Sequence, residues 1–211
     1  MDQDAAWTVI GSERRSLADL LEGLDPAALA TPSLCDAWTV LGVGAHLTLS
    51  PLSRPADVLS AFWRAGGRFD RAVALATERV LDHPVEQVVR DLRRTSTMRT
   101  HPLGTTYREP LIDVLVHGQD IAVPLGLERG MPVEAAAFAA RRVWTAIFPF
   151  FPQRRLSGLE LLAEDSDLRV GRGAPVRGRT QDLLLLSTGR YARVDRLSGE
   201  GSAVLAERVR V

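Results

Sequence analysis

Residues 110–123 combine three ionisable side chains with an otherwise apolar sequence. On a helix that advances about 100° per residue, His117 lies about 40° to one side of Asp113, and Asp120 about 20° to the other. The three side chains therefore share one narrow stripe of a helix that is apolar nearly all round, and such a helix is normally buried. Buried charges need a partner or a metal, because desolvating an unpaired charge costs several kcal/mol.

Two interpretations of this stripe are open. Asp113 and His117, four residues apart, can form a half-buried ion pair worth a few tenths of a kcal/mol. Alternatively they are metal ligands, and His46 favours this second interpretation. A lone histidine on an apolar helix stripe is usually a core residue, but a helical bundle can bring inward ligands from different helices together. Two neutral imidazoles and one carboxylate form a three-ligand site with an open position, which is typical of catalytic zinc and also suits iron(II).

Other polar residues near these positions allow more than one role. Asp120 can orient a ligand imidazole through its free N–H, or it can pair with a neighbouring arginine. Cys35 precedes an expected helix start, where the helix dipole would lower the pKa of its thiol. No histidine is close to it in sequence, so we interpret Cys35 as a packed small residue rather than a nucleophile. His83 and His101 each precede a proline and are interpreted as solvated.

Two kinds of secondary structure are expected to position these residues. Apolar spacings of three and four residues, capping residues and prolines predict helices over residues 7–24, 39–50, 56–80, 85–98, 110–123 and 132–148. The later part of the chain predicts strands over 159–163, 168–170 and 191–197, turns at Gly171, Gly173 and Gly178, and helices over 180–188 and 202–209. The predicted fold class is mainly α: a four-helix bundle over residues 1–150, then a small α+β domain over 151–211.

Composition excludes several classes of function. The 211 residues carry 26 basic and 26 acidic side chains and no net charge, so nothing favours a nucleic-acid partner. Every basic residue is Arg, which excludes Schiff-base and P-loop lysine chemistry. The single cysteine excludes internal disulfides and multi-cysteine metal sites. The acidic N-terminal residues are not expected to form a signal peptide, and no apolar run is long enough to span a membrane, so we expect a cytoplasmic protein without a membrane partner.

Three segments resemble a known family. Pro32-Ser-Leu-Cys-Asp-Ala-Trp-Thr-Val-Leu-Gly-Val-Gly-Ala-His46-Leu is similar to the first metal-ligand helix of the mycothiol-dependent maleylpyruvate isomerase family, within the DinB-like superfamily. Arg108-Glu-Pro-Leu-Ile-Asp113-Val-Leu-Val-His117-Gly-Gln-Asp-Ile resembles the second ligand segment. Residues 176–190 resemble the small C-terminal domain of many members. The resemblance therefore implies a DinB-like metal-binding bundle followed by that C-terminal domain.

The resemblance also implies a ligand set and a chemistry. The metal ligands would be His46, Asp113 and His117, with Asp113 standing where characterised isomerases have the longer Glu, and Zn²⁺ is the expected divalent metal. Mycothiol, the low-molecular-weight thiol of actinobacteria, would bind the metal as thiolate. The thiolate would add to the double bond of maleylpyruvate, and rotation followed by elimination would give fumarylpyruvate. Arg190 is a candidate for holding the thiol or the substrate.

Other outcomes remain compatible with the same residues. A thiol S-transferase would release the adduct formed with a small-molecule electrophile instead of eliminating the thiol. A non-catalytic metal-binding or small-molecule-sensing bundle would use the metal to stabilise the fold or to recognise a ligand. We expect a monomer or a homodimer.

Overall fold

The computed structural model describes residues 1–35, 38–52, 63–64, 66, 71, 77–78, 80–102, 104–146 and 149–209. The chain divides into two compact units, Asp2–Arg129 and Gly130–Val211, with Met1 joining the second. This division falls before the sequence-based boundary near residues 150–157. The helix expected over 56–80 lies almost entirely outside the described residues.

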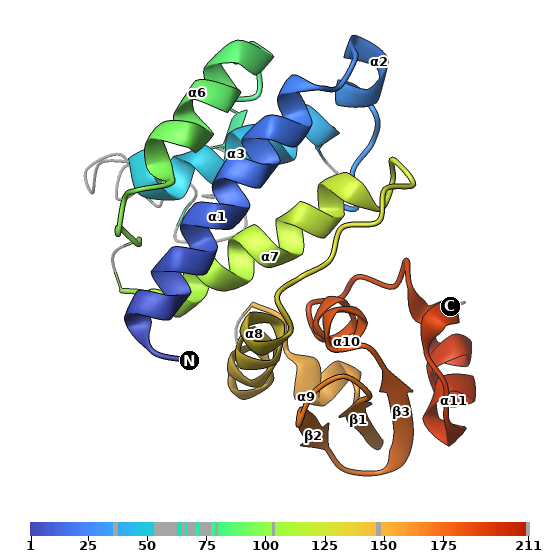
Figure 1. Cartoon of the computed structure of the whole chain (residues 1–211). Helices are drawn as coiled ribbons and strands as arrows, with labels where there is room; N and C mark the ends of the chain where they lie inside the picture. Colours follow the sequence, from blue (N-terminus) through green and yellow to red (C-terminus); the bar gives the residue numbers. More distant parts are fainter. Residues whose placement is uncertain are drawn as a thin grey trace. The chain divides into compact units, whose positions relative to one another are not determined.

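Four helices of the N-terminal unit pack as the predicted bundle. Helices α1 and α3 each contact both α6 and α7 (Figure 1). A short helix, α2, follows α1. The helices of this unit span α1 Gln3–Glu22, α2 Pro26–Leu29, α3 Val40–Leu52, α6 Val85–Thr95 and α7 Arg108–Ala122.

Local sequence explains where α1 and α3 begin and end. The side chain of Asp2 accepts a hydrogen bond from Ala5 N at 2.8 Å and so caps α1. Thr39 caps α3 as predicted, because its Oγ1 accepts from Gly42 N at 3.1 Å. The prediction that Pro51 ends α3 is wrong, since the helix continues to Leu52 with the proline in its last turn.

Helix α7 is the most buried element of the unit. Every residue from Pro110 to Ala122 is buried except Asp113. The helix begins at Arg108 rather than at the predicted Pro110. The proline is tolerated in the first turn, where a backbone N–H has no partner within the helix. This burial on all sides is what the apolar sequence of residues 110–123 predicts.

The C-terminal unit is a small mixed sheet with helices. Strand β1 is central and pairs antiparallel with β2 and parallel with β3. Helix α8 belongs to this unit by its contacts, because it packs against α10 rather than completing the bundle (Figure 1). The elements span α8 Val133–Thr145, α9 Pro152–Arg155, β1 Leu159–Ala163, β2 Arg169–Gly171, β3 Ala174–Gly178, α10 Thr180–Ser187, the 3₁₀ turn Val194–Arg196 and α11 Glu200–Val209.

Two predictions for this unit are wrong. Residues 191–197 form no strand; they contain the 3₁₀ turn, and only Ser198 forms an isolated bridge, with Arg177. Gly171 and Gly178, both expected in turns, end strands β2 and β3 instead. A Cβ at Gly178 would lie 2.5 Å from Cδ2 of Leu197, so close packing rather than a turn explains this glycine. Among the described helices, none is both long and apolar enough to cross a membrane.

Candidate metal centre

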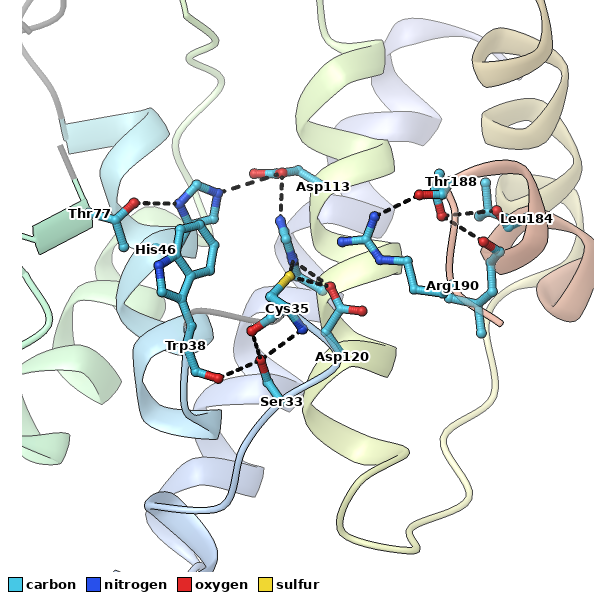
Figure 2. A network of polar contacts seen from close by, with 12 residues as sticks. Ser33, Cys35, Trp38, His46, Thr77, Asp113, Asp120, Leu184, Thr188 and Arg190 are labelled. Atoms are coloured by element: carbon cyan, nitrogen blue, oxygen red, sulfur yellow. Dashed lines mark hydrogen bonds and ion pairs between the residues drawn. The ribbon is translucent and has the colours of Figure 1, made fainter. Parts of the chain in front are cut away.

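Three potential ligands meet between α3 and α7 of the N-terminal unit. Asp113 Oδ1 lies 3.3 Å from His117 Nε2 and 3.9 Å from His46 Nε2 (Figure 2). One donor atom from each of these residues lies within 4.8 Å of the other two. The structure thus brings together all three residues that the sequence singled out as metal ligands.

The helices position these side chains by simple geometry. Asp113 and His117 are four residues apart and lie on the same face of α7. His46 comes from α3, which packs directly against α7. A Cβ at Gly44, two residues before His46, would lie 2.6 Å from Leu21 Cδ1, so this glycine lets α3 approach α1 closely. Close packing of α3 therefore helps to hold His46 beside α7.

The second nitrogen of each imidazole already has a partner. His46 Nδ1 lies 3.1 Å from Thr77 Oγ1. His117 Nδ1 lies 2.8 Å from Oδ2 of Asp120, a side chain that is completely buried. When Nδ1–H donates to such a partner, Nε2 keeps its lone pair for a metal. Both Nε2 atoms face Asp113, so the donor set fits a divalent cation bound by two imidazoles and one carboxylate.

Trp38 packs against both imidazoles. Its ring centroid lies 4.6 Å from that of His46, with the planes inclined by 30°, and 6.2 Å from that of His117. The two imidazoles themselves meet edge to face, with centroids 5.0 Å apart. The indole thus restricts ring rotation in both candidate ligands and covers part of the centre with apolar surface.

In the metal-free centre, the surroundings favour the charged forms of both Asp113 and His117. Burial disfavours the charged form of Asp113, but its contacts with the imidazoles of His117 and His46 outweigh it and hold the pKa of this carboxyl well below its ordinary value. Burial likewise opposes protonation of His117, yet contacts with Asp113, Asp120 and Cys35 raise its pKa well above 6.5. In the absence of a cation, the two neighbouring carboxylates therefore favour the protonated form of His117.

Cys35 lies on the opposite side of His117 from Asp113. Its Sγ is 3.2 Å from Asp120 Oδ2, to which the thiol donates, and 3.8 Å from His117 Nδ1 (Figure 2). Ser33 Oγ accepts from Cys35 N at 3.0 Å and donates to Trp38 O at 2.8 Å. This juxtaposition was not predicted, because the sequence around Cys35 carries no periodic pattern from which a partner can be inferred.

The remaining candidates make contacts of their own. Arg190 belongs to the C-terminal unit, is half-buried, and donates from Nη1 to Thr188 O at 3.0 Å (Figure 2). Its role toward thiol or substrate stays a prediction. His101 is exposed as expected. His83 is not simply solvated: its Nδ1 is buried and has no hydrogen-bond partner among the described residues.

Comparison with known proteins identifies the fold. Residues 10–53 match the sequence profile of the family described as mycothiol maleylpyruvate isomerase N-terminal domain. A crystal structure of mycothiol-dependent maleylpyruvate isomerase with a histidine replaced by alanine superposes with a TM-score of 0.63 at 16% identity, covering 96% of this chain and 94% of that chain. A second crystal structure of mycothiol-dependent maleylpyruvate isomerase gives a TM-score of 0.58 at 18% identity, with the same coverage. No curated protein sequence matches the chain.

The chain therefore has the mainly helical fold of the mycothiol-dependent maleylpyruvate isomerases, which confirms the predicted fold class. The segment that matches the family profile, residues 10–53, includes His46.

Proposed function

We propose that this protein is a metal-dependent enzyme that uses mycothiol, either as a cis–trans isomerase of maleylpyruvate-like substrates or as a thiol S-transferase. The convergence of His46, Asp113 and His117 within the fold of the mycothiol-dependent maleylpyruvate isomerases carries this proposal. Three protein ligands leave a tetrahedral cation one open position, the arrangement that distinguishes catalytic from structural zinc sites.

A bound divalent cation, with Zn²⁺ the expected ion, would supply a Lewis acid that favours the thiolate form of a thiol near neutral pH. Side chains of the protein orient the ligand atoms and set the charge at the position that this cation would occupy. Asp120 holds the proton of His117 at Nδ1, so that Nε2 faces the cation position. Thr77 contacts Nδ1 of His46 in the corresponding way. The carboxylate of Asp113 remains ionised and neutralises one positive charge.

The packing around the centre favours an anionic fourth ligand. Trp38 covers the two imidazoles with apolar surface, which lowers the local dielectric constant and strengthens attraction between a cation and an incoming anion. Asp113 is the most accessible of the three ligands, its side chain being 32% exposed, against 14% for His46 and 11% for His117. We therefore place the approach of the thiol on the Asp113 side.

Recognition of the substrate requires positive charge beyond the metal. Arg190 is our candidate, because the planar guanidinium pairs with a carboxylate through two hydrogen bonds. Arg190→Lys keeps the positive charge but loses the planar guanidinium that forms both hydrogen bonds. If Arg190 binds substrate, Arg190→Lys and Arg190→Ala should both raise KM, with Lys the milder change. An unchanged KM in both variants would show that Arg190 does not bind the substrate.

The proposed function is tested by titrating mycothiol into the zinc-loaded protein in a calorimeter. We expect one mycothiol per chain in the wild type and no binding in His117→Ala. His101→Ala is the matched control, since it replaces an exposed histidine outside the centre and should bind mycothiol normally. Failure of the fully metallated wild type to bind mycothiol would contradict the proposal and favour a non-catalytic metal-binding or sensing bundle.

A further inference from the structure

His117 presents its two ring nitrogens to two different sets of metal-ligating side chains. Its Nε2 faces Asp113 and His46, the set described above. Its Nδ1 lies 2.8 Å from Asp120 Oδ2 and 3.8 Å from Cys35 Sγ, and Cys35 and Asp120 are themselves 3.2 Å apart. Cys35, His117 and Asp120, the thiol-side set, thus also place three donor atoms within one cation's reach.

These distances suit a bound cation. Ligand atoms around a tetrahedral zinc ion lie about 3.3–3.6 Å from one another, given bonds of about 2.0–2.3 Å. The three donor–donor separations in the thiol-side set, 2.8, 3.2 and 3.8 Å, lie on both sides of this range. Shifts of a few tenths of an ångström would therefore let the three atoms coordinate one ion. Asp120 is fully buried and His117 nearly so, while Cys35 is half-buried and leaves a route of entry.

We infer that Cys35, His117 and Asp120 form a second position for a thiophilic divalent cation such as Zn²⁺ or Cd²⁺, and that it excludes occupation of the first. The thiolate sulfur is the soft ligand that the His46 set lacks, so softer cations should prefer the thiol-side set. Binding releases the thiol proton of Cys35 and the Nδ1 proton of His117 to solvent.

The exclusion follows from the chemistry of imidazole. A neutral imidazole carries one N–H, so a cation on one nitrogen leaves the proton on the other. With the cation on Nε2, the proton stays on Nδ1, and Asp120 accepts it. With the cation on Nδ1, the proton is on Nε2, and Asp113 Oδ1, 3.3 Å away, accepts it. His117 therefore has a proton acceptor on either side and can serve one cation position at a time.

Cadmium titration of the metal-free protein tests this inference, because a cadmium–thiolate bond gives an ultraviolet charge-transfer absorption that His and Asp ligands do not. We expect this absorption in the wild type, saturating at one cadmium per chain. His46→Ala removes the first set but keeps the thiol-side set, so it should retain the absorption. Cys35→Ser should lose it, with Cys35→Ala as a second thiol-free variant if the serine variant folds poorly.

Three results would overturn the inference: no charge-transfer absorption in the wild type, its loss in a folded His46→Ala variant, or two cadmium ions bound per chain at saturation. Folding of each variant is checked by circular dichroism. This test is separable from that of the proposed function. Cys35→Ser keeps His46, Asp113 and His117, so titrating mycothiol into its zinc-loaded form examines the first set alone.

Discussion

The indole of Trp38 lies over the imidazole of His46, with ring centroids 4.6 Å apart and planes inclined by 30°. Trp38 immediately precedes the cap of α3, and His46 lies two turns into that helix. The start of the helix therefore folds back over one of its own candidate metal ligands. This contact fixes the ring of His46 before any cation arrives, which reduces the entropy lost on binding.

Replacing Trp38 should weaken metal binding without abolishing it. An aromatic pair contributes about 0.5–1.5 kcal/mol beyond buried area, which corresponds to a change in affinity of about 2- to 12-fold. We expect Trp38→Leu to raise the zinc dissociation constant by that factor, measured by competition with a chromophoric chelator. Trp38→Phe retains a ring and should show the smaller effect. Equal affinities in all three proteins would show that the stacking does not pre-organise His46.

Asp120 should matter to the metal although it does not belong to the His46 set. Loss of a carboxylate that orients a ligand imidazole typically lowers metal affinity by about 10- to 100-fold. We expect a fall of this size in Asp120→Ala and a smaller one in Asp120→Asn, whose amide oxygen can still accept from His117 Nδ1. Zinc affinity at constant pH is the measurement, with thermal unfolding of the metal-free variants as the control for folding.

Cation binding should stabilise the folded chain through His46. A ligand that binds only the folded state at 1,000 times its dissociation constant adds about 4 kcal/mol to the free energy of unfolding. We expect zinc to raise the melting temperature of the wild type and of His101→Ala, and to raise that of His46→Ala by less, because only the thiol-side set is intact in that variant. A zinc-induced rise of the same size in His46→Ala would show that the cation stabilises the fold from another position.

The metal-free protein should depend on pH through His117 and Asp113. Burial opposes ionisation of both groups, but the contacts of Asp113 with the two imidazoles lower its pKa, and the contacts of His117 with Asp113, Asp120 and Cys35 raise its pKa. The His117 contribution is fully present below its ordinary pKa of 6.5 and is lost as pH rises through the raised value. The Asp113 contribution is present above 3.8 and is lost as pH falls through the lowered value.

The pair therefore stabilises the metal-free fold most between those two ordinary pKa values. Denaturant unfolding of chelator-treated protein should show stability falling toward alkaline pH, and this component should vanish in His117→Gln. Zinc affinity should follow the opposite trend and rise with pH, because the cation must displace a proton from His117. A zinc affinity independent of pH across the neutral range would exclude His117 as a ligand.

Gly178 offers a test of packing in the C-terminal unit. A Cβ there would meet Leu197 Cδ2 at 2.5 Å, and overpacking of this kind costs about 1–3 kcal/mol. We expect Gly178→Ala to lower the free energy of unfolding by that amount. Gly130→Ala is the matched control, since a Cβ at Gly130 would meet no heavy atom of the described residues within 4 Å. Two variants of equal stability would show that Leu197 moves aside at little cost.

Sequence patterns predicted the regular part of the fold. Strand β1 has the predicted bounds, because its alternating leucines carry a clear signal. Strand β3 was missed, since Gly173 and Gly178 were interpreted as turn residues. In the structure Gly178 packs closely against the side chain of Leu197 at the end of this edge strand.

Prediction of the candidate metal centre was also reliable only for residues in regular helices. Helical spacing placed Asp113 and His117 on one face, and the expected bundle brought His46 to them. Cys35 could not be placed, because its position depends on long-range contacts of an irregular loop, including Leu34 N donating to Asp120 O at 3.2 Å.

The order in which the donors emerge from the ribosome has a consequence for metal acquisition. Cys35 and His117 are separated by 82 residues of sequence, and Cys35 and Asp120 by 85. The early chain thus offers a thiol and one imidazole without the residues of α7 that complete either set. The His46 set is complete once residue 117 has been added and the thiol-side set once residue 120 has been added, both before residues 130–211 are made. Metal capture is therefore possible while translation of the second unit continues.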